Sequence, residues 1–382
     1  MRLLVVSHTA HHLENGEPRG WGPTVREIDR LASLFDELVH VAPVHSGPAP
    51  ASALPYEARN VRLVPVRPSG GTTLLAKLGL VGAWAGYLRV ILEELRRCDA
   101  VHVRCPSNIG LLTILLLALG RRPRSRWVKY AGNWRPEGRE SVSYALQRWL
   151  LRRGVARAIV TVNGTWPEQP EHVRAFLNPC LTEQELREGA ALGASKNLRA
   201  PLRLLFVGRV EEAKGCGRAV EILDGLRRQG VDAVLDVVGD GADRPTMMGG
   251  AQKSGLGDRI RWLGWLSRGE LNRLYGEAHI LLLPSLSSEG WPKVLSEGMA
   301  YGAVPVASTV SSIPEYLANF RAGRALDPAD RQSYVDTIAA YVREPERWRA
   351  ESRRAMEAAA RFTYDSYLRA VREVLVTKAG AA

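Results

Sequence analysis

Cysteine is scarce in this sequence: the 382 residues include four, and none of them forms a CxxC pair. This scarcity predicts neither a disulfide framework nor a zinc site, and it is typical of a protein from a reducing compartment. His8, His11 and His12 could suggest a metal cluster, but ordinary loop histidines explain them more simply. We therefore find no convincing set of metal ligands and expect a cytoplasmic location.

Long apolar runs are also lacking. The stretch from Leu111 to Gly120 is too short to cross a bilayer as a helix. The stretch from Leu74 to Leu95 is longer, but four charged residues interrupt it. The apolar N-terminus breaks into histidines too early for a signal peptide. We expect both longer stretches to be helices packed on a sheet.

Positive charge, in contrast, is abundant, with a net charge of +12 and a pI of about 9.8. Such a balance indicates either a solvated basic surface or an anionic partner, for example a nucleic acid, a nucleotide or the acidic face of a membrane. No RNA- or DNA-binding module pattern occurs, so we expect no nucleic-acid partner. The length favours two domains.

Buried-type strands alternate with helical stretches along the chain. The first half predicts strands at 3–7, 39–44, 61–66, 100–104, 127–131 and 158–163, with a loop at 8–22 and a helix at 23–35. The second half predicts strands at 202–208, 233–239, 260–264 and 280–284, with helices at 215–229, 244–254 and 267–278. This alternation predicts an α/β fold with two parallel sheets and a ligand cleft between the two halves.

One strand–loop–helix–strand unit, Ser285 to Ser308, contains two acidic residues. Glu289 belongs to the loop, and Pro292 suits the first position of a helix that ends before Gly302. Glu297 would then lie about one and a half turns into that helix. The two carboxylates could bind sugar or ribose hydroxyls, or they could be ordinary surface acids.

A second candidate site is the segment GRVEEAKG, 208–215. Arg209 and Lys214 would emerge at the carboxyl end of a strand, next to the N-terminus of a helix, where a diphosphate could bind. The alternative is a turn with two solvated cations. Glycines at 239 and 241 follow the next strand and allow close approach of a ligand, although a plain turn fits them equally well.

Together these spacings resemble the retaining, nucleotide-sugar-dependent glycosyltransferases with the GT-B fold (glycosyltransferase family 4, glycosyl transferases group 1). The resemblance covers about 110 residues and rests on Gly208, Arg209, Lys214, Gly215, Gly239, Asp240, Gly241, Gly264, Pro284, Ser285, Glu289, Gly290, Pro292, Val294, Glu297, Met299, Ala300, Gly302 and 305–308.

The resemblance implies roles for these residues. Glu289, Arg209 and Lys214 would be catalytic, with the two cations stabilising the departing nucleoside diphosphate and Glu289 contacting the donor sugar. Glu297 would bind the ribose, and backbone N–H groups of 290–293 would face the sugar or phosphate. The resemblance also implies that neither a metal ion nor a cofactor is needed. The implied donor-binding set is Gly22, Gly208, Gly239, Gly264, Gly290, Trp291, Pro292, Lys293, Val294 and Glu297.

The first half resembles the family more loosely. Gly20-Trp21-Gly22 replaces the usual adjacent glycine pair, and the segment KYAGNW, 129–134, lacks the histidine that the family often has there. The candidates for the acceptor side are Trp21, His102, Lys129, Tyr130, Asn133 and Trp134. The resemblance implies two Rossmann-like domains, residues 1–180 for the acceptor and 201–360 for the nucleotide sugar, with a linker at 181–200. Residues 361–382 would form a helix that crosses back to the first domain.

We therefore expect a retaining hexosyltransferase that moves a sugar from a UDP- or GDP-sugar to a saccharide or polyprenyl-linked acceptor in envelope or exopolysaccharide assembly. The alternative is a catalytically degenerate GT-B protein that binds a nucleotide or glycan. The helix predicted at 145–157 is amphipathic and basic, so it either packs on the sheet or lies against an anionic membrane surface as well, which would make the protein peripheral on the inner face.

Overall fold

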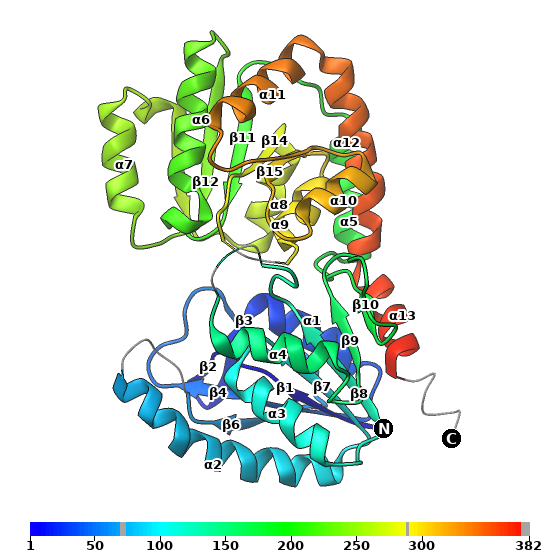
Figure 1. The fold of residues 1–382 in the computed structure, drawn as a ribbon. Helices are drawn as coiled ribbons and strands as arrows, with labels where there is room; N and C mark the ends of the chain where they lie inside the picture. The colour runs from blue at the N-terminus through cyan, green and yellow to red at the C-terminus, as the bar shows by residue number, and fades with distance from the viewer. Residues whose placement is uncertain (69–73, 137, 139, 288–289, 376–382) are drawn as a thin grey trace. The chain divides into compact units, whose positions relative to one another are not determined.

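The computed structural model describes residues 1–68, 74–136, 138, 140–287 and 290–375, with residues 74–83 described as backbone. It divides into two compact units, and Figure 1 shows an α/β arrangement in each. Unit 1 comprises 1–177 together with the described residues from Tyr364 onward, and unit 2 comprises 178–363. The predicted α/β class is confirmed.

Unit 1 is built on a ten-stranded sheet whose long axis runs β10-β9-β8-β7-β1-β4, with β6 also paired to β4. These strands are parallel because each follows a crossover. Their bounds are β1 Arg2–Val6, β4 Glu37–His45, β6 Val61–Val66, β7 Ala100–Cys105, β8 Ser125–Tyr130, β9 Ile159–Val162 and β10 Val173–Ala175.

Alternate residues of β1 enter two separate cores. Leu3 and Val5 pack with α1 and α13, whereas Leu4 and Val6 pack with α2, α3 and α4. Because successive side chains of a strand point to opposite faces of the sheet, each face has its own apolar core and is covered by helices. The helices are α1 Gly22–Ala32, α2 Leu74–Arg97, α3 Asn108–Leu119, α4 Val142–Arg152 and α13 Tyr364–Leu375.

The segment predicted as a loop at 8–22 is instead a β-hairpin, so that prediction was wrong. Strands β2 (His11–Glu14) and β3 (Glu17–Trp21) pair antiparallel, and β5 (Ala53–Pro55) joins β3. Asn15 and Gly16 form the turn with φ of 53° and 83°. An Asn-Gly pair between two short strands is a strong hairpin signal, since both residues tolerate positive φ.

Unit 2 contains a six-stranded parallel sheet in the order β13-β12-β11-β14-β15-β16. The strands are β11 Leu202–Val207, β12 Ala233–Val238, β13 Ile260–Gly264, β14 Ile280–Leu283, β15 Val304–Ser308 and β16 Arg324–Leu326. The helices are α5 Glu183–Ala194, α6 Cys216–Arg228, α7 Arg244–Lys253, α8 Arg268–Glu277, α9 Lys293–Ala300, α10 Ile313–Phe320, α11 Arg331–Arg343 and α12 Pro345–Ala359, with short 3₁₀ turns η1 Glu212–Lys214, η2 Gly257–Arg259 and η3 Ala360–Phe362.

Residues 181–200, which we expected to be a linker, contain helix α5. A capping box formed by Thr182 and Glu185 starts this helix, and α5 packs on α8, α9 and α12 within unit 2. The chain passes between units after Leu177 and re-enters unit 1 at Tyr364. Within the described part of the chain, no helix is both long and apolar enough to cross a membrane.

Candidate active site

Three glycines draw together the carboxyl ends of β11, β12 and β13. The Gly208 N–H donates to Val238 O at 3.0 Å, and the Gly239 N–H donates to Gly264 O at 2.7 Å. Gly239 has a φ of +121°, and a Cβ there would lie 2.0 Å from Gly208 O. A side chain at this position would therefore force the strand ends apart.

The loop after β11 carries the two predicted cations. Arg209 is largely exposed, and its Nη1 lies 2.8 Å from the carboxylate of Glu211. Burial, with a smaller contribution from nearby Arg209, lowers the pKa of Lys214 to about 8. An amine with a depressed pKa gains stability when an anion binds beside it, so this loop suits a phosphate-bearing ligand.

Hydrogen bonds connect the same loop to the segment after β14. Gly215 has a φ of +87°, and a Cβ there would lie 2.1 Å from Pro284 O. The Leu286 N–H donates to Ala213 O at 2.9 Å, and the buried Arg218 donates to Pro284 O and Glu212 O at 2.7 Å each. These bonds bring the Arg209–Lys214 loop beside the start of the segment that leads to α9. Arg218 was not among the site residues predicted from the sequence, since its partner Pro284 lies 66 residues away in the chain.

Glu297 on α9 lies inside an ionic network. Its Oε1 is 2.7 Å from Arg268 Nη1, and Tyr275 Oη donates to its Oε2 at 2.9 Å. Arg268 also pairs with Glu185 at 2.6 Å and donates to Cys180 O. The two carboxylates raise the pKa of Arg268 well above its usual value, in spite of its burial. Each carboxylate oxygen of Glu297 thus has one partner, and each keeps capacity for a second hydrogen bond.

Glu289, which was predicted to be catalytic and to contact the donor sugar, lies outside the described residues. Hydrogen bonds within unit 2 fix Gly290 and Trp291. Ser312 Oγ donates to Gly290 O at 2.8 Å, and Trp291 Nε1 donates to Ser296 Oγ at 2.7 Å. The Trp291 ring is buried and stacks on Phe362 with ring centroids 5.6 Å apart. Only the backbone of Trp291 is therefore placed to face a ligand.

The remaining donor-site residues are placed as follows. Pro292 is the N-cap of α9 rather than its first helical residue, and Lys293 and Val294, both half-buried, open the helix. Gly22, in unit 1, is the first residue of α1, where its N–H donates to Ser52 O at 2.9 Å. That N–H is already paired, so Gly22 serves the β3–α1 turn.

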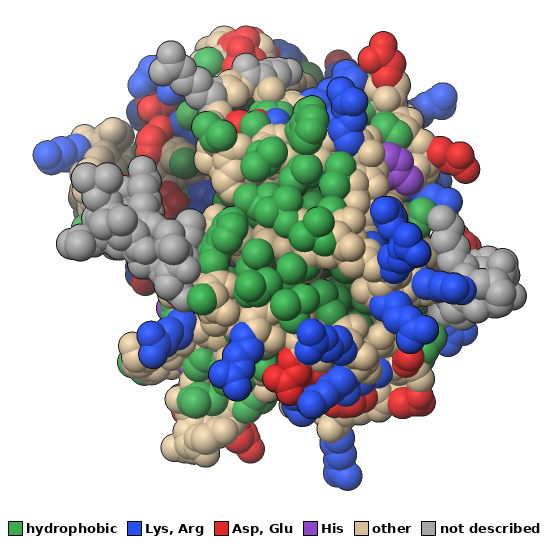
Figure 2. Space-filling model, turned by 60° about the horizontal axis from the view of Figure 1, so that its bottom comes forward, with side chains coloured by type: hydrophobic (Ala, Val, Ile, Leu, Met, Phe, Trp, Pro, Cys, Tyr) green, Lys and Arg blue, Asp and Glu red, His purple; other side chains and the backbone are tan. Residues whose placement is uncertain are grey.

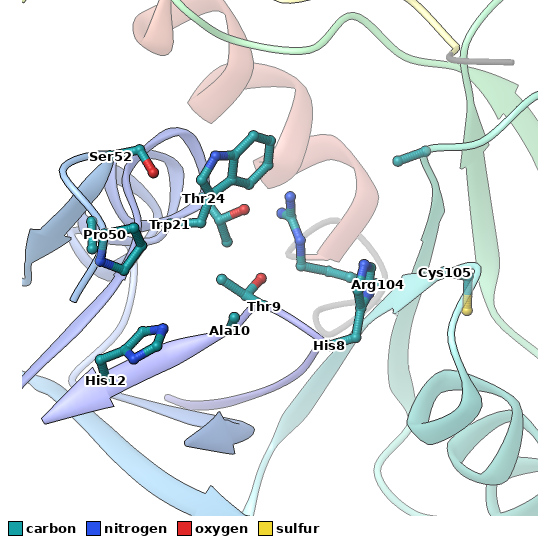
Figure 3. Close-up of a pocket in the computed structure, with 12 residues that line it drawn as sticks. His8, Thr9, Ala10, His12, Trp21, Thr24, Pro50, Ser52, Arg104 and Cys105 are labelled. Carbon is teal, nitrogen blue, oxygen red and sulfur yellow. The ribbon is translucent and has the colours of Figure 1, made fainter. Parts of the chain in front are cut away.

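Unit 1 has a pocket of about 440 Å³ at the carboxyl ends of β1 and β7 (Figure 3). The exposed indole of Trp21 lies at this pocket, with polar groups from Thr9, Thr24 and Ser52 and the guanidinium of Arg104. An aromatic face beside hydroxyl and cationic groups is a suitable surface for a sugar. Of these lining residues, only Trp21 was predicted from the sequence to be on the acceptor side.

Four other acceptor-side candidates are buried: His102, Lys129, Tyr130 and Trp134. His102 lies within β7 and stacks on Trp127, with ring centroids 3.7 Å apart, and burial keeps the pKa of its imidazole well below the usual value. Tyr130 and Trp134 pack edge to face in the core. His102 and Tyr130 belong to strands of a sheet covered on both faces, which explains why their side chains point into the core, and Trp134 follows β8 and packs on Tyr130.

Lys129 is buried as well, 2.7 Å from the fully buried carboxylate of Glu27, which also binds Arg104 at 2.8 Å. A single buried acid thus holds two cations and fixes Arg104 at the pocket. Asn133 is half-buried, and its Oδ1 accepts from the N–H of Arg135. Asn133 therefore organises its own loop.

Thr9, which lines the pocket, belongs to a closed circuit of hydrogen bonds, that is, a ring of bonds in which each residue is bonded to the next. His11 Nδ1 lies 2.8 Å from Thr9 O, which can only accept, so His11 Nε2 must accept from Tyr56 Oη at 2.7 Å. Tyr56 then accepts from His40 Nδ1 at 2.6 Å, Ser7 Oγ donates to His40 Nε2 at 2.7 Å, and Thr9 N–H returns the circuit to Ser7. Burial lowers the pKa of His11 to about 4, which keeps this arrangement neutral.

The comparisons with known proteins agree with this architecture. Superposition on sucrose-phosphate synthase from Thermosynechococcus elongatus gives a TM-score of 0.72 over all of both chains at 16% identity. Anabaena HepE, solved in complex with UDP, gives 0.66 over 98% of this chain and 99% of that one, at 14% identity. The fold is thus GT-B, with two Rossmann-like α/β domains.

Sequence relatives narrow the class. Residues 195–362, less than half of the chain, match the family described as glycosyl transferases group 1. An alpha-D-kanosaminyltransferase from Streptomyces kanamyceticus is 24% identical over 75% of this chain and 80% of its own. The amylovoran biosynthesis glycosyltransferase AmsK from Erwinia amylovora is 34% identical over 36% of this chain and 35% of its own, so the chain spans about a third of that relative. The resemblance to group 1 glycosyltransferases of GT-B type is confirmed.

Among the described residues, no three His, Cys, Asp or Glu side chains gather as a metal site would require. The roles expected for individual site residues and the absence of a metal stay predictions.

Proposed function

We propose that this protein is a retaining glycosyltransferase that moves a sugar from a UDP- or GDP-sugar to a hydroxyl of a saccharide or polyprenyl-linked saccharide. The main support for the proposal is that hydrogen bonds hold the Arg209–Lys214 loop against the segment after β14. This places the loop beside the N-terminus of α6. Two cations and a helix N-terminus in one place suit a diphosphate.

In the proposed reaction, the bond between the anomeric carbon and the β-phosphate oxygen breaks, and the electron pair leaves with the nucleoside diphosphate. The acceptor oxygen bonds to the same face of the anomeric carbon, and its proton passes to the departing phosphate oxygen. Arg209 and Lys214 stabilise the charge that develops on that phosphate. No metal ion or cofactor takes part in this scheme.

Glu297 would accept hydrogen bonds from the donor ribose with the lone pairs that Arg268 and Tyr275 leave unused. Arg268 acts here as a positioning residue, since it fixes the carboxylate before the ligand arrives. Glu289 would contact the donor sugar, as the family resemblance implies.

We assign the acceptor to the pocket of unit 1, with a sugar ring on Trp21 and its hydroxyls on Thr9, Thr24 and Ser52. The name of AmsK, a biosynthesis enzyme of the polysaccharide amylovoran, supports a role in exopolysaccharide or envelope assembly. The complex of HepE with UDP supports a uridine nucleotide. A cytoplasmic protein that is peripheral on the inner membrane face fits such an acceptor.

A thermal-shift panel of UDP, GDP and their sugars tests the donor, because a bound ligand raises the apparent stability by RT ln(1 + [L]/Kd). Release of nucleoside diphosphate from the stabilising sugar nucleotide then tests catalysis. Stabilisation without any release, with or without saccharide acceptors, would favour the degenerate binding module instead. No stabilisation by any nucleotide would contradict the transferase and a nucleotide-binding module, and would leave glycan binding as the alternative.

A further inference from the structure

Helix α4 exposes a stripe of apolar side chains to solvent. Val142 is 85% exposed and Trp149 is 53% exposed, and Leu146 between them is also exposed. Positions 142, 146 and 149 share one face of a helix. The opposite face buries Leu150 and Leu151 in the core, together with Gln147 and Arg148.

Gln147 and Arg148 can be buried because both have partners inside unit 1. Gln147 Oε1 accepts from the N–H of Ser107 at 3.0 Å, and Arg148 forms a close ion pair with Glu140. The orientation of α4 is therefore fixed by specific bonds. As a consequence, a stripe of aliphatic and aromatic side chains is exposed to water. Such an exposed apolar stripe is unusual for a surface helix and is a typical feature of interaction sites.

Helix α3 extends this apolar surface. It packs on α4, and its last residue, Leu119, is 87% exposed. The buried Arg126 donates to Leu117 O at 2.6 Å and to Ala156 O at 3.0 Å, which ties the end of α3 to the segment after α4. The two helix ends therefore lie on one side of unit 1.

Arginines border this surface. Arg121, Arg122 and Arg124 are exposed directly after α3, and Arg153, at the end of α4, lies with its guanidinium carbon 5.6 Å from the centre of the Trp149 ring. Figure 2, which turns the lower face of unit 1 toward the viewer, shows hydrophobic side chains gathered together with Lys and Arg side chains along the border.

We propose that Val142, Leu146, Trp149 and Leu119, with the arginines at 121, 122, 124 and 153, form a surface that docks on an anionic lipid bilayer. Convex helix faces can enter the boundary between head groups and acyl chains, where tryptophan is favoured. Arginine stems cover apolar surface while their guanidinium groups bind lipid phosphates. Clustered positive charge around an apolar ridge is complementary to an anionic bilayer, in which phosphate groups lie above an apolar layer.

Sedimentation of the full chain with vesicles tests the proposal. We expect binding to vesicles of equimolar phosphatidylcholine and phosphatidylglycerol, weak binding to phosphatidylcholine alone, and loss of binding at high salt. The double variant Leu119→Ser/Trp149→Ser should lower vesicle binding at least about tenfold, since two apolar side chains lose their burial. Val342→Ser, an exposed valine on α11 in unit 2, is the matched control and should bind as the parent does.

The charge contribution is tested separately. Arg121→Gln/Arg122→Gln should weaken binding by about fivefold for each arginine, whereas Arg353→Gln on α12 should have no effect. Equal binding of the parent to neutral and anionic vesicles, or unchanged binding of either double variant, would overturn the proposal. A dimer that the Leu119→Ser/Trp149→Ser variant abolishes, without vesicle binding by the parent, would assign the surface to a second copy of the chain. Nucleotide-dependent thermal shifts report on the donor site independently, so failure of the two proposals can be told apart.

Discussion

The carboxyl ends of the two parallel sheets differ in where the functional side chains lie. In unit 2, Arg209 and Lys214 lie in the loop after β11, and Glu297 lies within helix α9, where it is buried in an ionic network. In unit 1, His102, Lys129 and Tyr130 lie within strands and are buried. Loop residues after a strand can reach a ligand, whereas residues of a doubly covered strand pack into the core. The first four predictions that follow test this difference, starting with the largest effect.

Arg268→Ala should have the largest effect, because it leaves the carboxylates of Glu185 and Glu297 buried without their cation. Loss of one partner of a buried ion network typically costs about 3–5 kcal/mol of unfolding free energy. Chemical denaturation of the variant measures this cost. The matched control is Arg273→Ala on the same helix, which should stay within about 0.5 kcal/mol of the parent. An Arg268→Ala variant as stable as the parent would contradict the network.

Lys214→Ala should lower kcat/KM for transfer by about 100- to 1,000-fold while the fold persists, because a cation at the departing phosphate is lost. Circular dichroism verifies the fold, and Lys253→Ala on α7 provides an exposed lysine as control. Transfer at the parent rate would remove Lys214 from the site.

The pH dependence of nucleotide binding follows from the same lysine. Its pKa is lowered to about 8, so the free protein loses this charge as the pH rises through 8, and affinity for UDP or GDP should fall from pH 7 to pH 9. Titration calorimetry across this range measures the change, and Lys214→Ala should flatten it. A profile that stays the same in the variant would place the titrating group elsewhere.

Tyr56→Phe should destabilise unit 1 by about 1–3 kcal/mol, because the buried nitrogens of His11 and His40 lose their shared partner. Denaturant unfolding measures the effect. Since Thr9 lies in the pocket, acceptor KM should rise while donor hydrolysis stays unchanged. A change in donor hydrolysis alone would contradict the role assigned to this circuit.

Trp21→Ala should raise the acceptor KM by about fivefold, equivalent to about 1 kcal/mol of lost ring stacking. Trp21→Phe should restore most of the affinity, and Trp265→Ala, an exposed tryptophan of unit 2, is the control for loss of an exposed indole. An unchanged acceptor KM would move the acceptor out of this pocket.

Much of the fold follows from local patterns. Near-continuous apolar strands between helices predict both parallel sheets, and glycines at 208, 239 and 264 mark the strand ends that meet. The β2–β3 hairpin was missed, although Asn15-Gly16 is a local signal for it. Helix α5 was missed because its polar, alanine-rich sequence was interpreted as a linker, although Thr182 and Glu185 form a capping box.

The sequence by itself determined the positions where only glycine fits, such as Gly215 and Gly239, and the alternation of strands and helices that makes the two sheets. Tertiary structure alone decided that Arg268 neutralises Glu297, that Arg104 reaches the pocket while Lys129 is buried, and that α4 turns its apolar stripe outward. The physical reason is the range of the interactions. Backbone conformation depends on neighbouring residues, whereas the partner of a charge or an apolar face is chosen by whatever part of the chain folds against it.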